Sequence, residues 1–392
     1  MTQTADIIII GGGVMGASIA YHLAQRGAGR VVLIERGALC SGTTSLSGAI
    51  VRQHYSNDFT VRMAGESLRV FQHFNEQVGG ECGFTTTGLL VLSDEQGAQA
   101  LRANVGLQQG QGVNTRLIDV ADIPQVAPGF SSEDVALACY EADCGVADPV
   151  ATTHCFARRA QEQGAIIQEG VTVSRILTQR GRVSGVVTSQ GEITAPVVVL
   201  AANVWSVALA REMGIELPIT ATRHPMVALH RPGDANEYTQ MHAVCFDSTL
   251  GTYLRPDLGG ITLVGAVANV LAASDPDHYP RGLSDEEIAH LSSAGAKHFP
   301  ALARAVARGG WSGIYDDTPD YHPILGRLPA YDGLYCAVGF SGHGFKLSPT
   351  IGAWLAETIL SGSTPADMQH FAYERFAQGK LIQPRYASGV LG

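Results

Sequence analysis

A glycine-rich segment near the C-terminus contains the residues whose types and spacing most directly suggest chemistry. Residues 339–349 read GFSGHGFKLSP, with His343 between glycines and Lys346 where a helix over about 346–361 is predicted to begin. The N-terminus of a helix favours anions and disfavours cations, because its first N–H groups are unpaired. A lysine at this position therefore requires an anionic partner. Two partners are open: a substrate carboxylate, or negative charge that develops on a reduced cofactor.

A second group of glycines, at the start of the chain, has the spacing of a dinucleotide-binding site. Four isoleucines, Ile7–Ile10, predict a buried parallel strand, and Gly11, Gly13 and Gly16 follow with GxGxxG spacing. Gly11 would form the tight turn. Gly13 would let a pyrophosphate approach the backbone, and Gly16 would let helix and strand pack closely.

The segment after this motif favours FAD over NAD. Val31–Ile34 predict a second buried strand that ends in Glu35, where an acid binds ribose hydroxyls and repels a 2′-phosphate. The alternation of strands and helices typical of an NAD-binding domain stops after Glu35, and no second GxGxxG pattern follows. The cofactor must then be reduced by the substrate itself, as in FAD enzymes whose C-terminal segment returns to cover the flavin ring.

Composition excludes several other classes of protein. The formal net charge of −10 and the pI near 5.7 offer no basic surface, so we expect no nucleic-acid partner. Seven cysteines without a CxxC pair predict neither a disulfide framework nor a zinc site, and favour the reducing cytoplasm. We expect no cleaved leader and no membrane span, because the apolar run near the start is too short. We expect no metal, because no HExxH motif or His/Cys cluster occurs. Trp205, Trp311 and Trp354 are expected to be core residues.

The pattern of apolar residues predicts an α/β fold, α+β overall. A Rossmann-like FAD-binding domain is interleaved with an antiparallel-sheet substrate domain. Helices are expected at 60–76, 150–163 and 284–299, the last opened by a Ser284/Glu287 capping box. The FAD-binding domain is assigned to residues 1–87, 145–215 and 315–392, and the substrate domain to residues 88–144 and 216–314.

Motifs across the whole length resemble the D-amino-acid-oxidase superfamily of FAD proteins, and within it the sarcosine oxidase branch, both monomeric and β-subunit-like. The matching segments are DIIIIGGGVMGASIAYHLA at 6–24, Glu35-Arg36, TTSLSG at 43–48, VVVLAANVWS at 197–206, YLRP at 253–256, DDTPDYHPILG at 316–326 and GFSGHGFKLSP at 339–349. The resemblance implies oxidation of an amino acid or a sarcosine-like secondary amine. It further implies that a hydride would pass to flavin N5 and that the resulting imine would hydrolyse.

The resemblance also implies a set of site residues. Lys346 and Arg52 would hold the substrate carboxylate, a role that suits the planar fork of arginine. Tyr315 and Tyr253 match tyrosines of the sarcosine-type site, and Tyr315 stands where glycine oxidases have an arginine. The expected cofactor-binding residues are Gly11, Gly13, Val14, Met15, Gly16, Glu35, Arg36, Thr43, Thr44, Ser47, Gly48, Val173, Ala201, Gly342, His343, Gly344, Phe345 and Lys346.

Departures from the family pattern qualify these expectations. Monomeric sarcosine oxidases attach FAD through a cysteine that aligns with Gly313, so we expect non-covalent FAD. Their oxygen-activating lysine falls within residues 261–264, which read ITLV, so the acceptor could be O₂, a quinone, an electron-transfer protein or a partner subunit. Arg255 could replace that lysine or be an ordinary turn residue. The alternative functions are an FAD-dependent 2-hydroxy acid or polyol dehydrogenase, and a flavin subunit of a larger electron-transfer complex.

Overall fold

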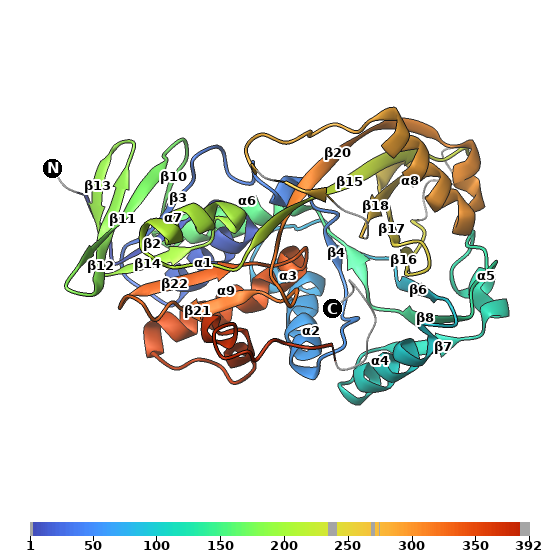
Figure 1. Ribbon diagram of the computed structural model, residues 1–392, viewed down its shortest axis with the longest axis horizontal. Helices are drawn as coiled ribbons and strands as arrows, with labels where there is room; N and C mark the ends of the chain where they lie inside the picture. Colours follow the sequence, from blue (N-terminus) through green and yellow to red (C-terminus); the bar gives the residue numbers. More distant parts are fainter. Residues whose placement is uncertain (1–2, 234–240, 268–270, 274, 385–392) are drawn as a thin grey trace.

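A mostly parallel sheet built on the N-terminal isoleucines forms one half of the molecule (Figure 1). The computed structural model describes residues 3–233, 241–267, 271–273 and 275–384. Within them the strand order is β10-β3-β2-β14-β22-β21, with only β21 antiparallel to its neighbour. The strands are β2 (Ile7–Ile10), β3 (Val31–Ile34), β10 (Ile166–Gln168), β14 (Val197–Leu200), β21 (Ile324–Arg327) and β22 (Leu334–Val338).

Both faces of this sheet are covered, which explains the unbroken run of isoleucines. Ile7 and Ile9 pack in one core with the helices α1 (Val14–Gln25), α6 (Pro149–Glu162) and α9 (Gly344–Ser361). Ile8 and Ile10 face the other core. That core is completed by α7 (Ser206–Glu212) and by a small sheet of β1 (Gln3–Thr4), β13 (Gly191–Thr194), β12 (Arg182–Thr188) and β11 (Val173–Gln179).

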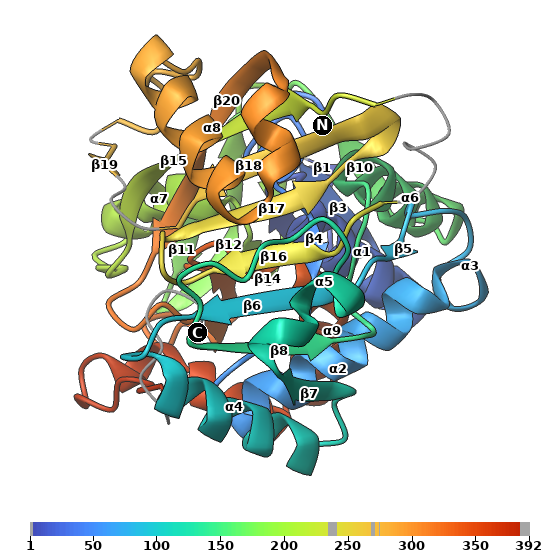
Figure 2. The ribbon, with the colours of Figure 1, turned by 90° about the vertical axis from the view of Figure 1, so that its right-hand side faces the viewer.

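The second half is a larger sheet assembled from two separate parts of the chain (Figure 2). Strands β6 (Leu89–Ser93), β7 (Thr115–Ile118) and β8 (Leu137–Glu141) come from the first part. The second part supplies β15 (Thr220–His230), β16 (Val244–Asp247), β17 (Thr252–Pro256), β18 (Ile261–Ala266), β19 (Leu271–Ala272) and β20 (Val306–Asp317). The expected antiparallel pairing holds except where the two parts meet, because β16 and β6 pair in parallel.

Helices cover both faces of the larger sheet. On one face lie α5 (Ile123–Val126) and α8 (Asp285–His298), which packs on β15, β17 and β18. On the other face α4 (Ala98–Gly110) shares a core with the short strands β4 (Ile50–Val51) and β9 (Gly145–Val146), and β5 (Thr85–Thr86) pairs with β9. The predicted capping box of Ser284 and Glu287 opens α8. The predicted helix at 60–76 is split into α2 (Asp58–Gln72) and α3 (Phe74–Gln77).

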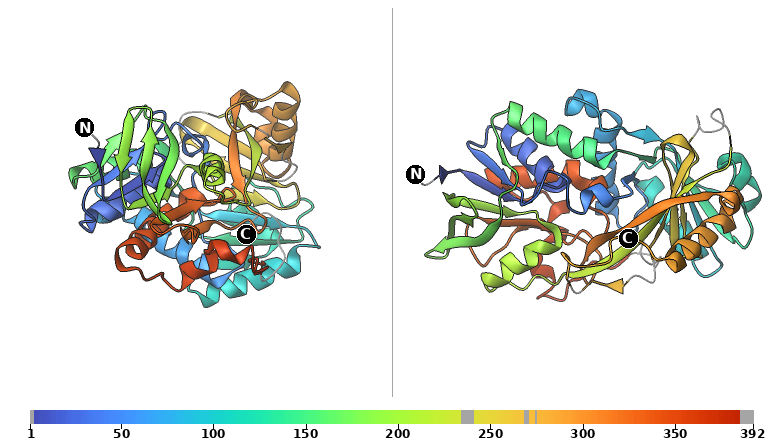
Figure 3. Two further views of the ribbon diagram at one scale, coloured as in Figure 1. Left: turned by 60° about the vertical axis from the view of Figure 1, so that its left-hand side comes forward. Right: turned by 90° about the horizontal axis from the view of Figure 1, so that it is seen from above.

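The paired strands β15 and β20 reach from the larger sheet toward the parallel-sheet half (Figure 3). The strands of the parallel sheet all lie in the segments assigned to the FAD-binding domain. Those of the larger sheet lie in the other two segments, except that β20 continues past residue 314 to Asp317. In the described part of the chain, no helix is both long and apolar enough to cross a membrane.

Candidate active site

A cavity of about 740 Å³ extends from the turn between β2 and α1 to Tyr315 at the end of β20. Most of the predicted cofactor residues line it, and four of them do not: Gly16, Gly48, His343 and Lys346. The lining members of that set are Gly11, Gly13, Val14, Met15, Glu35, Arg36, Thr43, Thr44, Ser47, Val173, Ala201, Gly342, Gly344 and Phe345.

The three N-terminal glycines have three different surroundings, in the way the motif predicts. Gly11 has a φ of 116° and lies against the backbone of Ala201 just after β14, so this position requires a glycine. A Cβ added at Gly16 would lie 1.9 Å from the carbonyl oxygen of Gly11, so helix and strand pack as closely as expected. A Cβ at Gly13 would meet only the Thr44 hydroxyl, at 3.0 Å, and would otherwise project into space that a ligand can use.

Glu35 and Arg36 lie side by side at the cavity but have different partners. The Glu35 carboxylate accepts the N–H of Gly12 at 2.7 Å and that of Gly37 at 2.8 Å. Each of its oxygens keeps a lone pair for a ribose hydroxyl. Arg36 forms an ion pair with Asp277 at 2.5 Å and stacks over the Trp205 indole, 4.5 Å from the ring centre. Its guanidinium therefore joins two parts of the protein.

Trp205 and Asp277 belong to the site although the sequence reasoning missed both. Trp205 was predicted to be core, but it lines the cavity, and its Nε1–H donates to Asp277 at 2.9 Å. Asp277 follows β19 in the chain and also lines the cavity, so a segment of the predicted substrate domain covers the nucleotide end. No local motif identifies such a residue, because its role depends on a contact between distant segments.

The loop before α9 contains an unusual run of left-handed backbone conformations. Gly339, Ser341 and Gly342 have φ values of 72°, 49° and 83°. A Cβ added at Gly342 would lie 2.3 Å from the Tyr315 ring. A Cβ added at Gly344 would lie 2.9 Å from the Phe340 ring. The atoms that exclude side chains at these two glycines belong to the protein itself. The expectation that the glycines make room for a flavin ring stays a prediction.

Lys346 is a buried cation at the N-terminus of α9. Its side chain is 7% exposed, and it forms no ion pair or hydrogen bond with the described residues. Burial lowers the pKa of Lys346 well below its usual range, and the positive charge of Arg52 lowers it further. A buried unpaired charge is costly, so the charged form of Lys346 needs an anion beside it, which the described protein does not supply.

Arg52 follows β4 and is also buried. Its guanidinium lies over the Tyr55 ring, 4.4 Å from the ring centre, and near the Phe246 ring at 5.2 Å. Arg52 also donates to the carbonyl of His54, and the Tyr55 hydroxyl lies 3.1 Å from Nδ1 of His343. The structure thus brings the predicted pair of cations into one electrostatic neighbourhood, although the two residues are far apart in sequence.

Glu141, at the end of β8, is an acidic member of this neighbourhood that the sequence did not reveal. Its side chain is fully buried and accepts the N–H of Gln53 at 2.8 Å. Burial raises the pKa of Glu141 to about 7, although the nearby charge of Arg52 opposes that rise. The carboxyl group therefore holds the backbone of Gln53, the residue that follows Arg52.

The remaining predicted residues have different positions. Tyr315 lines the cavity, whereas the Tyr253 hydroxyl donates to Sδ of Met226 at 3.3 Å. Arg255 lies within β17 and not in a turn. Its guanidinium donates to the carbonyls of Gly48 and Ala147 at 3.0 and 3.2 Å and pairs with Asp257. Arg255 thus connects the larger sheet to the cofactor half.

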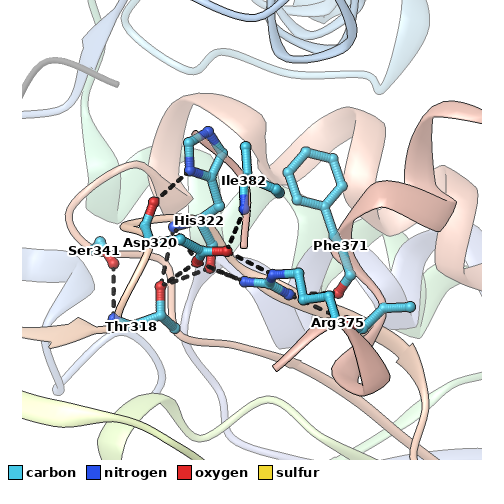
Figure 4. Close-up of polar contacts among 8 residues, drawn as sticks. Thr318, Asp320, His322, Ser341, Phe371, Arg375 and Ile382 are labelled. Carbon is cyan, nitrogen blue, oxygen red and sulfur yellow. Dashed lines mark hydrogen bonds and ion pairs between the residues drawn. The ribbon is translucent and has the colours of Figure 1, made fainter. Parts of the chain in front are cut away.

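A buried ion pair is linked by hydrogen bonds to the glycine loop (Figure 4). Asp320 accepts two hydrogen bonds from Arg375, both at 2.8 Å, and Thr318 donates to it at 3.2 Å. The backbone N–H of Thr318 in turn donates to the Ser341 hydroxyl at 3.2 Å. The C-terminal segment is therefore joined through Asp320 and Thr318 to the loop that precedes Lys346.

The residues present fit an FAD molecule. The long cavity begins at a glycine turn with open space at Gly13, continues past the Glu35 carboxylate, and ends at Tyr315 and α9. Gly313 lines the cavity and provides no thiol for a covalent link. No group of three or more potential metal ligands occurs within the described ranges.

The fold and cavity together define a flavoprotein, and the comparison with known families agrees. The model of the FAD dependent oxidoreductase family (DAO) matches residues 6–358, so the chain belongs to that family. The parallel cofactor sheet and the largely antiparallel second sheet are the fold expected from the sequence.

Particular relatives lie in the expected branch. The sarcosine oxidase subunit beta of Arthrobacter sp is 29% identical over 99% of this chain and 95% of its own length. Mitochondrial sarcosine dehydrogenase of Homo sapiens is 28% identical over 98% of this chain.

Among solved structures, L-proline dehydrogenase from P. horikoshii has a TM-score of 0.89 and 30% identity, covering 97% of this chain and 100% of its own. Glycine oxidase from Geobacillus kaustophilus has a TM-score of 0.82 and 25% identity, covering 95% and 98%. The chain spans 43% of the length of the human sarcosine dehydrogenase.

Proposed function

We propose that this chain binds FAD non-covalently and oxidises the carbon–nitrogen bond of an amino acid or N-substituted amino acid. The substrate carboxylate lies between Arg52 and Lys346. One observation supports this most directly: the Lys346 ammonium is buried and has no anionic partner among the described residues. The relatives named for sarcosine, L-proline and glycine all act on compounds of this kind.

The protein residues orient the substrate and set its protonation. Lys346 and Arg52 bind the carboxylate through charge-assisted hydrogen bonds, which places the rest of the molecule toward the cavity and Tyr315. Two nearby positive charges also disfavour an ammonium group, so they favour loss of the amine proton before oxidation. Bound FAD supplies the two-electron acceptor. The protein then needs no base at carbon.

A partner subunit is a second proposal, and a specific observation favours it. The relative from Arthrobacter, matched over nearly its whole length, is named as one subunit of sarcosine oxidase. Residues 261–264 lie in β18 and contain no lysine that could favour reaction with O₂. We therefore propose that a quinone, an electron-transfer protein or a partner subunit accepts the electrons in preference to O₂.

The carboxylate site is tested by comparing an amino acid with its methyl ester. Lys346→Met and Arg52→Ala should each slow anaerobic flavin reduction by the amino acid about 10- to 100-fold, because each removes a charge-assisted hydrogen bond. Reduction by the ester should change little, since the ester has no negative charge to lose. Rapid-mixing absorbance measures both rates.

Three other outcomes would contradict the proposal. Equal slowing of acid and ester would show that Lys346 acts on the reduced flavin and not on the substrate. Bleaching by 2-hydroxy acids but not amines would indicate a hydroxy acid dehydrogenase. No bleaching by any amine or hydroxy acid would indicate an electron-relay subunit.

A further inference from the structure

Tyr315 is held by a neighbour that the proposed function does not explain. Its ring stacks on the imidazole of His224 in β15, with ring centres 3.6 Å apart and planes inclined by 19°. The same ring lies against Gly342 of the glycine loop. Tyr315 lines the cavity, and none of the described residues hydrogen-bonds its hydroxyl. That hydroxyl is therefore available to a ligand, at a position that His224 helps to fix.

His224 is the middle of a chain of short polar contacts. Its Nδ1 lies 3.3 Å from the carbonyl oxygen of Ala266, and its Nε2 lies 3.0 Å from Oγ1 of Thr222. Oγ1 of Thr222 lies 2.5 Å from Oδ2 of Asp317. Thr222 is paired directly with Tyr315 across β15 and β20. Alternation along the two strands therefore places all four side chains on one face of the sheet.

Counting hydrogens predicts a titratable proton in this chain of contacts when each contact is a hydrogen bond. Three hydrogen bonds then require three hydrogens. The Thr222 hydroxyl supplies one and a neutral His224 imidazole supplies a second. The third must be a proton on the Asp317 carboxyl group or a second proton on His224.

The proton has two possible positions, and the total number of bound protons is the same in both. In one, Asp317 donates to Thr222, Thr222 donates to Nε2 of His224, and Nδ1–H donates to Ala266. In the other, the Asp317 proton has moved to Oγ1 of Thr222 and the Thr222 hydrogen has moved to Nε2 of His224. This leaves an Asp317 carboxylate and a His224 imidazolium. Burial raises the pKa of Asp317 and lowers that of His224 to about 4, and both shifts favour the first position.

We propose that His224, Thr222 and Asp317 form a one-proton relay that positions Tyr315 and makes carboxylate binding in the cavity depend on pH. This inference rests on the proposed carboxylate site. While the relay is protonated, the three side chains next to Tyr315 have no net charge. When the proton is lost, a half-buried Asp317 carboxylate remains and opposes a second carboxylate nearby. His224, Thr222 and Asp317 are positioning residues, since they act through Tyr315.

Other ionisable groups surround the relay and must be separated from it. Arg52 and Tyr253 are electrostatically coupled to Tyr315, and Asp316 precedes Asp317 on β20. From α8, Glu287 faces β15 but pairs with Arg223. A pH profile of the wild-type protein contains contributions from all of these groups. Only a comparison of variants isolates the relay.

The test uses acetate, a carboxylate without an amine, whose binding is followed by the absorption spectrum of the bound flavin. Wild-type affinity should fall as pH rises through the pKa of the relay, by about tenfold for a coupling of one pKa unit. Asp317→Asn should remove that fall, because its amide N–H always donates to Thr222. Thr222→Val should weaken acetate binding at low pH.

Thr262→Val is the matched control, because Thr262 contacts His242 at 2.9 Å in the same sheet, and His242 also contacts a backbone carbonyl.

A second measurement needs no ligand. The ¹⁵N NMR signals of His224, assigned with His224→Gln, should shift with pH in the wild type and stay constant in Asp317→Asn. An unchanged acetate profile in Asp317→Asn, or equal effects of Thr222→Val and Thr262→Val, would overturn the relay. If acetate does not bind at any pH, the carboxylate site fails. The ¹⁵N titration then decides the relay alone: a shift that Asp317→Asn abolishes supports it, and a shift that persists overturns it.

Discussion

Buried charges in this protein differ in whether the protein itself pairs them. Asp320 and Arg375 pair with each other, as do Asp247 and His298, and all four side chains are buried. Lys346 is equally buried and has no such partner in the described chain. Since leaving a charge buried and unpaired is costly, the contrast separates structural ion pairs from a binding site.

The His298–Asp247 pair predicts a stability difference that disappears at high pH. Burial disfavours the imidazolium, but the hydrogen bond to Asp247, the negative charge of Asp247 and the contact with the Glu133 carbonyl together outweigh that effect and raise the pKa of His298. The stabilisation is therefore complete below the unfolded-state pKa, about 6.5, and is lost as pH rises through the raised folded-state pKa. His298→Gln should lower the free energy of unfolding by about 3 kcal/mol at low pH and by less at high pH, measured with urea.

A matched control for that prediction is His73, whose ion pair with Glu76 is exposed to solvent. His73→Gln should change the free energy of unfolding little at any pH, because exposed pairs contribute little. A loss in His298→Gln that stays constant from low to high pH would show that His298 acts through packing and not through its charge.

At the scale of elements, close contact between helix and strand decides where the cofactor can bind. Gly16→Ala should strongly reduce FAD binding, because the new Cβ would lie 1.9 Å from the backbone of Gly11 and would push α1 away from β2. Gly106→Ala in α4 is the matched control, since nothing lies within 4 Å of its added Cβ. That variant should keep FAD and gain up to about 1 kcal/mol of stability. Flavin absorbance per protein reports the first effect and urea unfolding the second.

The ion pair of Figure 4 joins the C-terminal segment to the glycine loop. Arg375→Lys should lower the free energy of unfolding by about 3 kcal/mol, because lysine cannot reproduce the two-point contact with Asp320 inside the protein. Arg327→Lys, at the exposed pair with Asp332, should change it by less than about 1 kcal/mol. Thermal or urea unfolding measures both. Similar losses in the two variants would show that burial of Asp320 is not the reason.

For the whole molecule, the cavity lies where two separately built sheets meet. Residues before β4 line it together with Tyr315, Asp277 and Arg281 from the segments of the larger sheet, and the Arg36–Asp277 pair joins the two sides. Cofactor binding should therefore hold the two halves together. Folding of either sheet alone would leave the cavity open on one side.

The purified protein should be yellow and should release its flavin when denatured. Heat or acid should bring FAD into the supernatant, because the lining residue Gly313 has no thiol to attach it. Absorbance of supernatant and precipitate measures the partition. Flavin that stays with the precipitate would contradict non-covalent binding, and a colourless protein that binds NADH would contradict the choice of cofactor.

The sequence alone determined the features that depend on neighbours in the chain. The positive φ of the turn at Gly11, the close packing at Gly16 and the capping box of α8 are all local. Each follows from steric contact or hydrogen bonding between residues a few positions apart, so the residue types suffice to predict it.

The tertiary structure decided every feature in which distant residues meet. Arg36 contacts Asp277, Trp205 lines the cavity as well as packing on a small hydrophobic cluster, and Glu141 accepts from the backbone next to Arg52. Arg255 donates to carbonyls of the cofactor half. No spacing pattern could predict these contacts, because they depend on how two insertions pair through β6 and β16 and on where β20 ends. The burial that leaves Lys346 without an anion is likewise set by the packing of the complete chain.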